Sequence, residues 1–390
     1  MKTDKWLESI RSEFPALTNR KNGKPPIYFD NACTTLVPKQ VMEAIKEYYE
    51  RFPGCGGKRS RYWFAREVEN RIEGNPEQGT QGARQTVQKF INARSEKEII
   101  FTMNTSHALN QVALGQKFQP GDVVLLTDKE HNSNLVPWLR LQKQGKIKVE
   151  IAASRPDDTI DLDDLQQKLA SRKVRLLAMA HTSNLTGYTI PAREIIKMAH
   201  DHGALVLLDA AQSVPHMVID VQDLDVDFLA FSIHKMCGPR GVGILYGKQD
   251  LLGKEVHEED DPACAIEPFI LGGGTLGDTT YDNYFLLEPP ERFEAGIQNY
   301  PGQIATAAAI QFLQRIGMPE INDVEKRLNS YLTERLLEQY GDTGWFQILG
   351  PQDPAQRGGI LTFEVKRPNA VGLAEELNSR NNIMIRDGVF

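Results

Sequence analysis

Cysteine is scarce in this sequence, and neither a metal-ligand motif nor a long hydrophobic run is present. The 390 residues include only four cysteines, none of them in Cys-x-x-Cys spacing: Cys33, Cys55, Cys237 and Cys264. This usage predicts neither a disulfide framework nor a zinc site. No apolar run approaches the roughly 20 residues of a membrane span, and residues 1–6 contain no signal-peptide core. We therefore expect no bound metal, no membrane partner and a cytoplasmic location.

A large excess of charge of either sign is also lacking. Lys and Arg number 45 against 52 Asp and Glu, which gives a formal net charge of −7. This mildly acidic balance argues against a dedicated nucleic-acid binder. A hydrophobic fraction of 41% and a charged fraction of 25% are ordinary for a globular protein. The length is enough for about two to three domains.

Short apolar runs alternate with helix-like segments in the middle of the chain. The runs lie at 99–101, 123–127, 149–152, 176–180 and 205–208. Such alternation predicts βαβ units, and therefore an α/β fold with a mostly parallel sheet flanked by helices.

The ends of the chain have different patterns. Residues 4–14 predict a short amphipathic helix, and residues 253–290 lack periodicity and predict a long connection. Helix patterns from 303 onward, followed by short strand-like runs, predict a smaller α+β unit. We expect three parts: an N-terminal arm (1–26), a large α/β domain (27–290) and a small C-terminal domain (291–390).

Lys235 is the candidate reactive residue. It lies on a short polar turn between apolar runs at 227–231 and 242–246, which predict strands. Lysine amines form Schiff bases with carbonyl groups, although most lysines are simply exposed on the surface. Asp209 weighs against the surface alternative, because it follows the apolar run at 204–208, and open α/β sheets bind ligands where their strands end. An acid at that position can pair with the pyridinium nitrogen of pyridoxal phosphate.

Two motifs together carry a family resemblance. Asp-Ala-Ala-Gln-Ser at 209–213 precedes Ser-Ile-His-Lys-Met-Cys-Gly-Pro-Arg-Gly-Val-Gly at 232–243. The pair resembles the class V aminotransferase family of pyridoxal phosphate enzymes, and within it the SUF-type cysteine desulfurases and selenocysteine lyases. The resemblance covers residues 27–390. It implies the type I aminotransferase-like fold, a mixed and mostly parallel sheet with a small α+β C-terminal domain, a homodimer, and pyridoxal 5'-phosphate bound by Lys235 in the large domain.

Thr105 and Ser106 precede a helix-like run at 108–117. Hydroxyls and free N–H groups at a helix N-terminus suit a phosphate, although the same residue types are common as plain helix caps. The resemblance implies that Thr105 and Ser106 bind the cofactor phosphate, and that Ser232 and His234 help to hold it.

Two further motifs follow expected strands. Glu-His-Asn-Ser-Asn at 130–134 resembles the family's Glu-His-His-Ala-Asn, which implies that His131 stacks on the pyridine ring and acts as an acid/base. Thr-Ser-Asn-Leu-Thr-Gly at 182–187 resembles Val-Ser-Asn-Val-Leu-Gly, which implies that Asn184 bonds the phenolic oxygen of the ring, with Gln212 also in reach. From residue type alone, His131 could be an ordinary loop residue and Asn184 a turn former.

The N-terminal part and the segment at 292–299 also follow the family pattern. Tyr-Phe-Asp-Asn-Ala-Cys-Thr-Thr at 28–35 resembles the stretch that lines the substrate pocket, which implicates Ala32. Arg-Phe-Glu-Ala-Gly-Ile-Gln-Asn at 292–299 resembles a stretch that reaches the partner subunit's site, with Ile297 in place of a phosphate-contacting threonine. Departures from the pattern cluster at 54–82, and the role of Cys55 there stays open.

The last eight residues, Ile-Met-Ile-Arg-Asp-Gly-Val-Phe at 383–390, resemble the family's Ile-Ala-Val-Arg-Thr-Gly-His-His. In the family the nucleophilic cysteine follows directly. The resemblance implies that Arg386 binds substrate. We therefore expect the nucleophilic cysteine just after Phe390 in a longer native protein, and no sulfur release by these 390 residues alone.

The expected function is that of a pyridoxal phosphate-dependent cysteine desulfurase with Lys235, His131 and Asp209 as catalytic residues. It would convert L-cysteine, or selenocysteine, to L-alanine and pass sulfur as a persulfide to an acceptor or iron–sulfur scaffold protein. Two alternatives stay open. One is another enzyme of the fold, such as a selenocysteine lyase, aminotransferase or epimerase. The other is a non-enzymatic scaffold, which the full set of cofactor-contact side chains disfavours.

Overall fold

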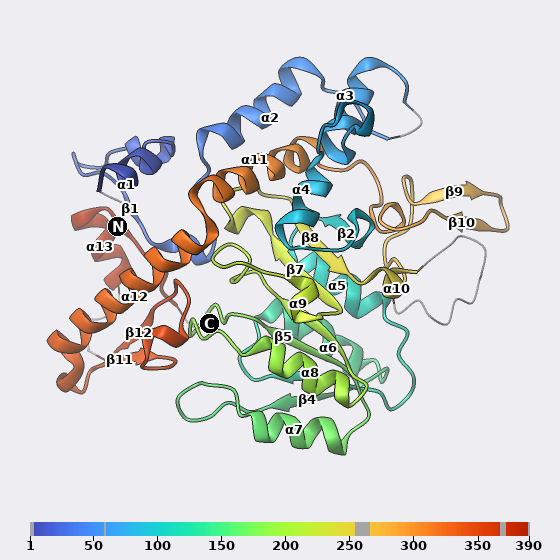
Figure 1. Cartoon of the computed structure of the whole chain (residues 1–390). Coiled ribbons are helices and arrows are strands. Elements are labelled where there is room, and N and C mark those ends of the chain that lie inside the picture. The colour runs from blue at the N-terminus through green and yellow to red at the C-terminus, as the bar shows by residue number, and fades with distance from the viewer. Residues whose placement is uncertain (1–3, 58–59, 254–265, 367–371, 389–390) are drawn as a thin grey trace.

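The computed structural model describes residues 4–57, 60–253, 266–366 and 372–388 (Figure 1). Cys264 and Phe390 lie outside these ranges. No helix in the described part of the chain is long and apolar enough to cross a membrane.

A seven-stranded sheet forms the centre of the large α/β unit. Its strands, in spatial order, are β2 (Ile99–Thr102), β8 (Gly243–Gly247), β7 (Phe228–Ser232), β6 (Leu205–Asp209), β5 (Val174–Ala180), β3 (Val123–Thr127) and β4 (Lys148–Ala152). The pairs from β7 to β4 are parallel, and β8 runs antiparallel to both of its neighbours. The prediction of a mixed, mostly parallel sheet is confirmed.

Helices cover both faces of this sheet, which explains why its central strands read as continuous apolar runs. Successive strand residues point to opposite faces, so Leu125 lies in one core and Leu126 in the other. The core that contains Leu126 includes residues of α5 (Thr105–Gly115), α6 (Asn132–Lys143) and α10 (Gln249–Leu252). The core with Leu125 is covered by α3 (Trp63–Glu73), α4 (Ala83–Phe90), α7 (Leu162–Ser171), α8 (Ala192–Asp201) and α11 (Tyr300–Ile316).

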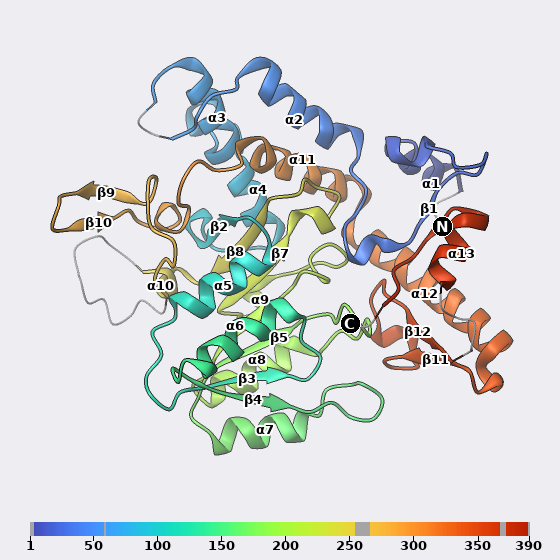
Figure 2. The same cartoon turned by 180° about the vertical axis from the view of Figure 1, so that it is seen from behind.

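Segments from the N-terminal and C-terminal parts of the chain pack together in a smaller unit on one side of the molecule (Figures 1 and 2). It contains α12 (Met318–Tyr340), the antiparallel pair β11 (Phe346–Leu349) and β12 (Thr362–Val365), and α13 (Leu373–Asn381). Strand β1 (Ile27–Tyr28), which follows α1 (Asp4–Arg11), pairs in parallel with β13 (Ile383–Met384). Helix α11 packs on α2 (Lys39–Arg51) and α4, beside the large sheet. The domain boundaries at 26/27 and 290/291 stay predictions.

A β-hairpin lies in the segment for which the sequence indicated only an irregular connection. Strands β9 (Leu276–Thr279) and β10 (Tyr284–Leu286) pair and project from the opposite side of the molecule to the small unit (Figures 1 and 2). Five of these seven hairpin residues are exposed and none is buried. A strand without a buried face has no alternation of apolar and polar residues, so the pattern could not reveal it.

Candidate active site

The candidate site residues gather where the parallel strands of the central sheet end. Asp209 is the last residue of β6 and Ser232 the last residue of β7. His131 follows β3 closely, and Asn184 follows β5. This edge is where open α/β sheets bind ligands, and loops far apart in the sequence meet there.

Helix α5 begins at this edge with Thr105 and Ser106 as its first two residues. Its cap is Asn104, whose side chain accepts the His107 N–H, so the alternative that Thr105 or Ser106 is a plain cap is wrong. The Thr105 N–H donates to Ser232 Oγ at 2.8 Å. Gly243 in β8 lets the Asn104 backbone pass close to the strand, because a Cβ at position 243 would lie 2.5 Å from that backbone.

The charges of Lys235 and Asp209 shift each other's pKa at this edge of the sheet. Lys235 ends a 3₁₀ turn (Ile233–Lys235) directly after β7, and Asp209 is 6% exposed. Burial lowers the pKa of the Lys235 amine, and the Asp209 charge opposes that shift. Burial raises the pKa of Asp209, while the Ala211 N–H and the charges of Lys235 and His131 lower it. A lysine with a lowered pKa is more often the neutral nucleophile that Schiff-base chemistry requires.

His131 caps helix α6. Its Nδ1 accepts the Ser133 N–H at 3.1 Å, so in the neutral ring the proton lies on Nε2. Burial lowers the pKa of His131, and the Lys235 charge adds to this, although Asp209 opposes it. The structure thus favours a neutral imidazole with an Nε2–H donor near Asp209 and Lys235.

The N-terminal segment is bound to this group by hydrogen bonds. Gln212 Nε2 donates to the Ala32 carbonyl at 2.7 Å, and Thr34 and Thr35 donate to the His234 carbonyl. Burial lowers the pKa of the His234 side chain, and the charges of Lys235 and Arg240 contribute. Gln212 Oε1 is buried and has no hydrogen-bond partner among the described residues. An orphaned acceptor of this kind is suited to a ligand donor.

Asn184 lies half-buried in the turn after β5. The turn is stabilised by Ser183 Oγ, which accepts the N–H groups of Leu185 and Thr186, each at 3.2 Å. The Asn184 amide is therefore not needed to form the turn.

Arg386 forms an ion pair with Asp30. Its Nε and Nη2 donate to the two carboxylate oxygens of Asp30 at 3.0 and 3.2 Å. The hydrogen bond and charge of Asp30 raise the pKa of Arg386. A substrate carboxylate would have to share or displace this partner.

The sequence reasoning assigned no role to two residues near this group. Cys33 lies near Lys235 and contributes to the electrostatic environment of its amine. Glu130, directly before His131, accepts three hydrogen bonds at the ends of β3 and β5 and at the start of α6. A charged residue shortly after the apolar run at 123–126 was the available signal for Glu130.

The donor set fits pyridoxal phosphate. The site combines an amine, a buried carboxylate, an imidazole, an orphaned amide oxygen and a helix N-terminus rich in hydroxyls: Lys235, Asp209, His131, Gln212, and Thr105 with Ser106. The described residues contain no group of histidines, cysteines and carboxylates suited to a metal ion. Fold and site together define the class of pyridoxal phosphate enzymes with the type I fold.

Comparison with known proteins identifies the family within that class. The model of the family described as aminotransferase class-V matches residues 27–389, and the chain belongs to this family of pyridoxal phosphate-dependent enzymes. The chain is 39% identical to a probable cysteine desulfurase of Pyrococcus abyssi, over 98% of this chain and 87% of the relative. It is 36% identical to one of Halalkalibacterium halodurans, over 97% and 87%.

Solved structures agree with this assignment. The apo structure of cysteine desulfurase from Thermococcus onnurineus NA1 has a TM-score of 0.85 at 35% identity, covering 100% of this chain and 88% of that chain. The cysteine desulfurase CsdA of Escherichia coli has a TM-score of 0.80 at 29% identity, covering 97% and 87%. The predicted family and fold class are confirmed.

Proposed function

We propose that this protein is a cysteine desulfurase, which converts L-cysteine to L-alanine and transfers the sulfur as a persulfide to an acceptor. The observation that carries the proposal is the meeting of Lys235, Asp209 and His131 beside the orphaned oxygen of Gln212. The names of the similar proteins from Pyrococcus abyssi and Escherichia coli support the substrate.

In this proposal each side chain holds one part of pyridoxal phosphate. Lys235 Nζ would bind the aldehyde carbon, Asp209 would pair with the ring nitrogen and His131 would stack on the ring. Asn184 and Gln212 would bond the phenolic oxygen, and the phosphate would be held by Thr105, Ser106, Ser232 and His234. When bound, the cofactor draws electrons from the substrate α-carbon.

The protein's own groups then handle protons and substrate. Once the substrate amine has replaced it on the cofactor, the free Lys235 amine, whose pKa is lowered by burial, would take the proton from the α-carbon. His131 offers a proton from Nε2, because Nδ1 is engaged by the helix cap. Ala32 lines the substrate side, where its carbonyl is held by Gln212. Arg386 binds the substrate carboxylate in exchange for Asp30.

We propose further that the protein acts as a homodimer and supplies sulfur for iron–sulfur cluster assembly. Large apolar side chains are exposed on and around the β9–β10 hairpin, a typical feature of an interaction surface: Ile270, Leu271, Tyr281, Phe285 and Ile297. The sulfur acceptor is then a thiol-bearing scaffold or shuttle protein.

The test is an assay of the native protein with L-cysteine, pyridoxal phosphate and a reducing thiol. We expect alanine and sulfide in equal amounts, and borohydride should attach the cofactor to the Lys235 peptide. Lys235→Ala should abolish both results, whereas Lys197→Ala, which removes an exposed lysine of α8, should leave them unchanged. Cofactor trapped on another peptide, or turnover of selenocysteine but not cysteine, would contradict the proposal.

A further inference from the structure

Glu130 is a charged residue at the site to which the proposed function assigns no role. Its carboxylate accepts hydrogen bonds from Thr127 Oγ1 at 2.5 Å, Asn134 Nδ2 at 2.6 Å and the Ala180 N–H at 3.0 Å. Thr127 ends β3, Ala180 ends β5 and Asn134 lies in the first turn of α6. The Glu130 side chain therefore links β3, β5 and α6, and it does so directly before His131.

The Asn134 amide, which is the donor from α6, is held in one orientation. Asn134 is fully buried, and its Oδ1 accepts the Nε1–H of Trp138, which is also fully buried, at 3.4 Å. With Oδ1 on Trp138, the amide can only direct Nδ2 at Glu130. The orientation of this pair is thus set by the core beneath α6.

The opposite side of the same helical turn contacts α5. Ser133 Oγ lies 2.6 Å from Ser106 Oγ, and the Ser133 N–H donates to His131 Nδ1. The turn that carries His131 is therefore held by Ser106 on one side and by Glu130 on the other.

All three partners of Glu130 donate, which is the arrangement that an ionised carboxylate accepts. Burial and the nearby Asp209 oppose this charge and raise the pKa of Glu130 to about 7, although its hydrogen bonds act in the other direction. A neutral amide at this position could not accept from all three groups, because one of its two polar atoms is a donor.

We propose that Glu130 is a positioning residue: its carboxylate bridges Thr127, Ala180 and Asn134 and so fixes the turn and the imidazole orientation of His131. The catalytic consequence rests on the proposed function, in which His131 moves a proton. The contacts themselves do not depend on it. A displacement of about 1 Å at a catalytic group can reduce the rate by about 10²-fold.

A reciprocal exchange tests the proposal. Glu130→Gln places an NH₂ group against Asn134 Nδ2, where two donors repel. Combining Glu130→Gln with Asn134→Asp reverses donor and acceptor: the amide at 130 donates to the carboxylate at 134, which still accepts Trp138. Asp128→Asn is the matched control, because Asp128 lies in the same loop and its carboxylate accepts hydrogen bonds from Ser154 rather than from β5 or α6.

Two measurements are made on the native protein. The first is ¹⁵N NMR of the imidazoles, with the His131 signals assigned through His131→Gln, in the protein with and without cofactor. The second is kcat and KM for alanine formation across pH. For Glu130→Gln we expect a changed His131 tautomer signal and a fall in kcat of about 10- to 100-fold with little change in KM. The double variant should recover both readouts, and Asp128→Asn should match the parent protein.

Unchanged His131 signals in Glu130→Gln, with activity lost only in proportion to unfolded protein, would overturn the proposal. Failure of the double variant to recover the His131 signals while remaining folded would overturn it as well. The NMR result stands even if the native protein does not act on cysteine, so failure of the proposed function is distinguishable from failure of this inference.

Discussion

At the scale of residues, burial and charge act against each other at the candidate site. Burial disfavours the charged forms of Asp209, Lys235 and His131, whereas the opposite charges among them partly restore those forms. Burial thus raises the pKa of Asp209 and lowers the pKa values of Lys235 and His131, and the attraction between Asp209 and the two basic groups opposes each of these shifts.

Asp209→Asn should test the carboxylate without changing the shape of the side chain. Loss of the negative charge beside the ring nitrogen weakens the electron sink, and we expect kcat to fall by about 10²-fold or more. The far-UV circular dichroism should stay the same. Asp201→Asn, at an exposed carboxylate of α8, serves as the control. Near-normal turnover of the Asp209 variant would contradict the proposed role of Asp209.

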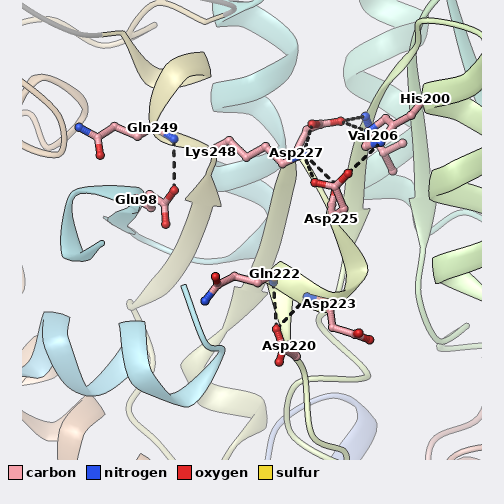
Figure 3. Close-up of polar contacts among 10 residues, drawn as sticks. All are labelled: Glu98, His200, Val206, Asp220, Gln222, Asp223, Asp225, Asp227, Lys248 and Gln249. Atoms are coloured by element: carbon pink, nitrogen blue, oxygen red, sulfur yellow. Dashed lines mark hydrogen bonds and ion pairs between the residues drawn. The ribbon is translucent and has the colours of Figure 1, made fainter. Parts of the chain in front are cut away.

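At the scale of elements, a second charged network lies at the opposite edge of the sheet, where the parallel strands begin (Figure 3). Asp227, just before β7, accepts the Val206 N–H at 2.8 Å, His200 Nε2–H at 2.8 Å and Lys248 Nζ at 2.9 Å. Asp225 adds an ion pair to Lys248. The network joins α8, β6, β7 and the end of β8, and therefore stabilises the sheet that positions the site.

This network should make stability depend on pH. The hydrogen bond to Asp227 raises the pKa of His200. Stabilisation from the charged imidazole is therefore complete below its ordinary pKa of about 6.5 and is lost as pH rises through the raised value. We expect His200→Gln to lower the free energy of unfolding by about 1–2 kcal/mol at pH 6 and by less at pH 9.

Urea unfolding at the two pH values measures this difference. His202→Gln, at an exposed neighbour on the same helix end, serves as the control. An equal cost of His200→Gln at both pH values would show that the charge of His200 makes no contribution.

A buried ion pair holds the segment before α11 in place. Arg84 is 3% exposed and donates to Glu294 at 2.7 Å, and Glu294 also accepts the Phe101 N–H of β2. Arg84→Met leaves a buried carboxylate without its cation, so we expect a loss of about 3–5 kcal/mol in chemical denaturation. Adding Glu294→Gln should recover part of that loss. A loss below 1 kcal/mol, on the order of an exposed pair, would contradict the prediction.

At the scale of the whole molecule, the exposed apolar residues near the β9–β10 hairpin bear on assembly. Ile297 is 82% exposed. If this surface joins two copies, Ile297→Glu places a charge in the interface and should shift dimer to monomer in sedimentation velocity. Leu328→Glu, at a 61% exposed leucine of α12, should leave the assembly unchanged. A parent protein that sediments as a monomer would contradict the proposed homodimer.

The sequence predicted the residue ranges of the central strands closely, because a strand buried on both faces must be apolar along its whole length. It also made Lys235 and Asp209 candidate site residues, because each is a charged residue placed shortly after such a run. The hairpin of β9 and β10 was missed because exposed strands have no such requirement. The helix cap at Asn104 was missed because Thr105 and Ser106 are equally good capping residues by type.

Local pattern and motif by themselves determined the family, the parallel sheet and the residues expected at the site, since these depend on neighbouring residues in the chain. Only the tertiary structure decided which polar groups meet. Gln212 bonds Ala32 across 180 residues, Arg386 pairs with Asp30, and Glu130 connects the ends of two strands to α6. Such contacts arise where the loops at one edge of the sheet converge, and no periodicity in the chain encodes them.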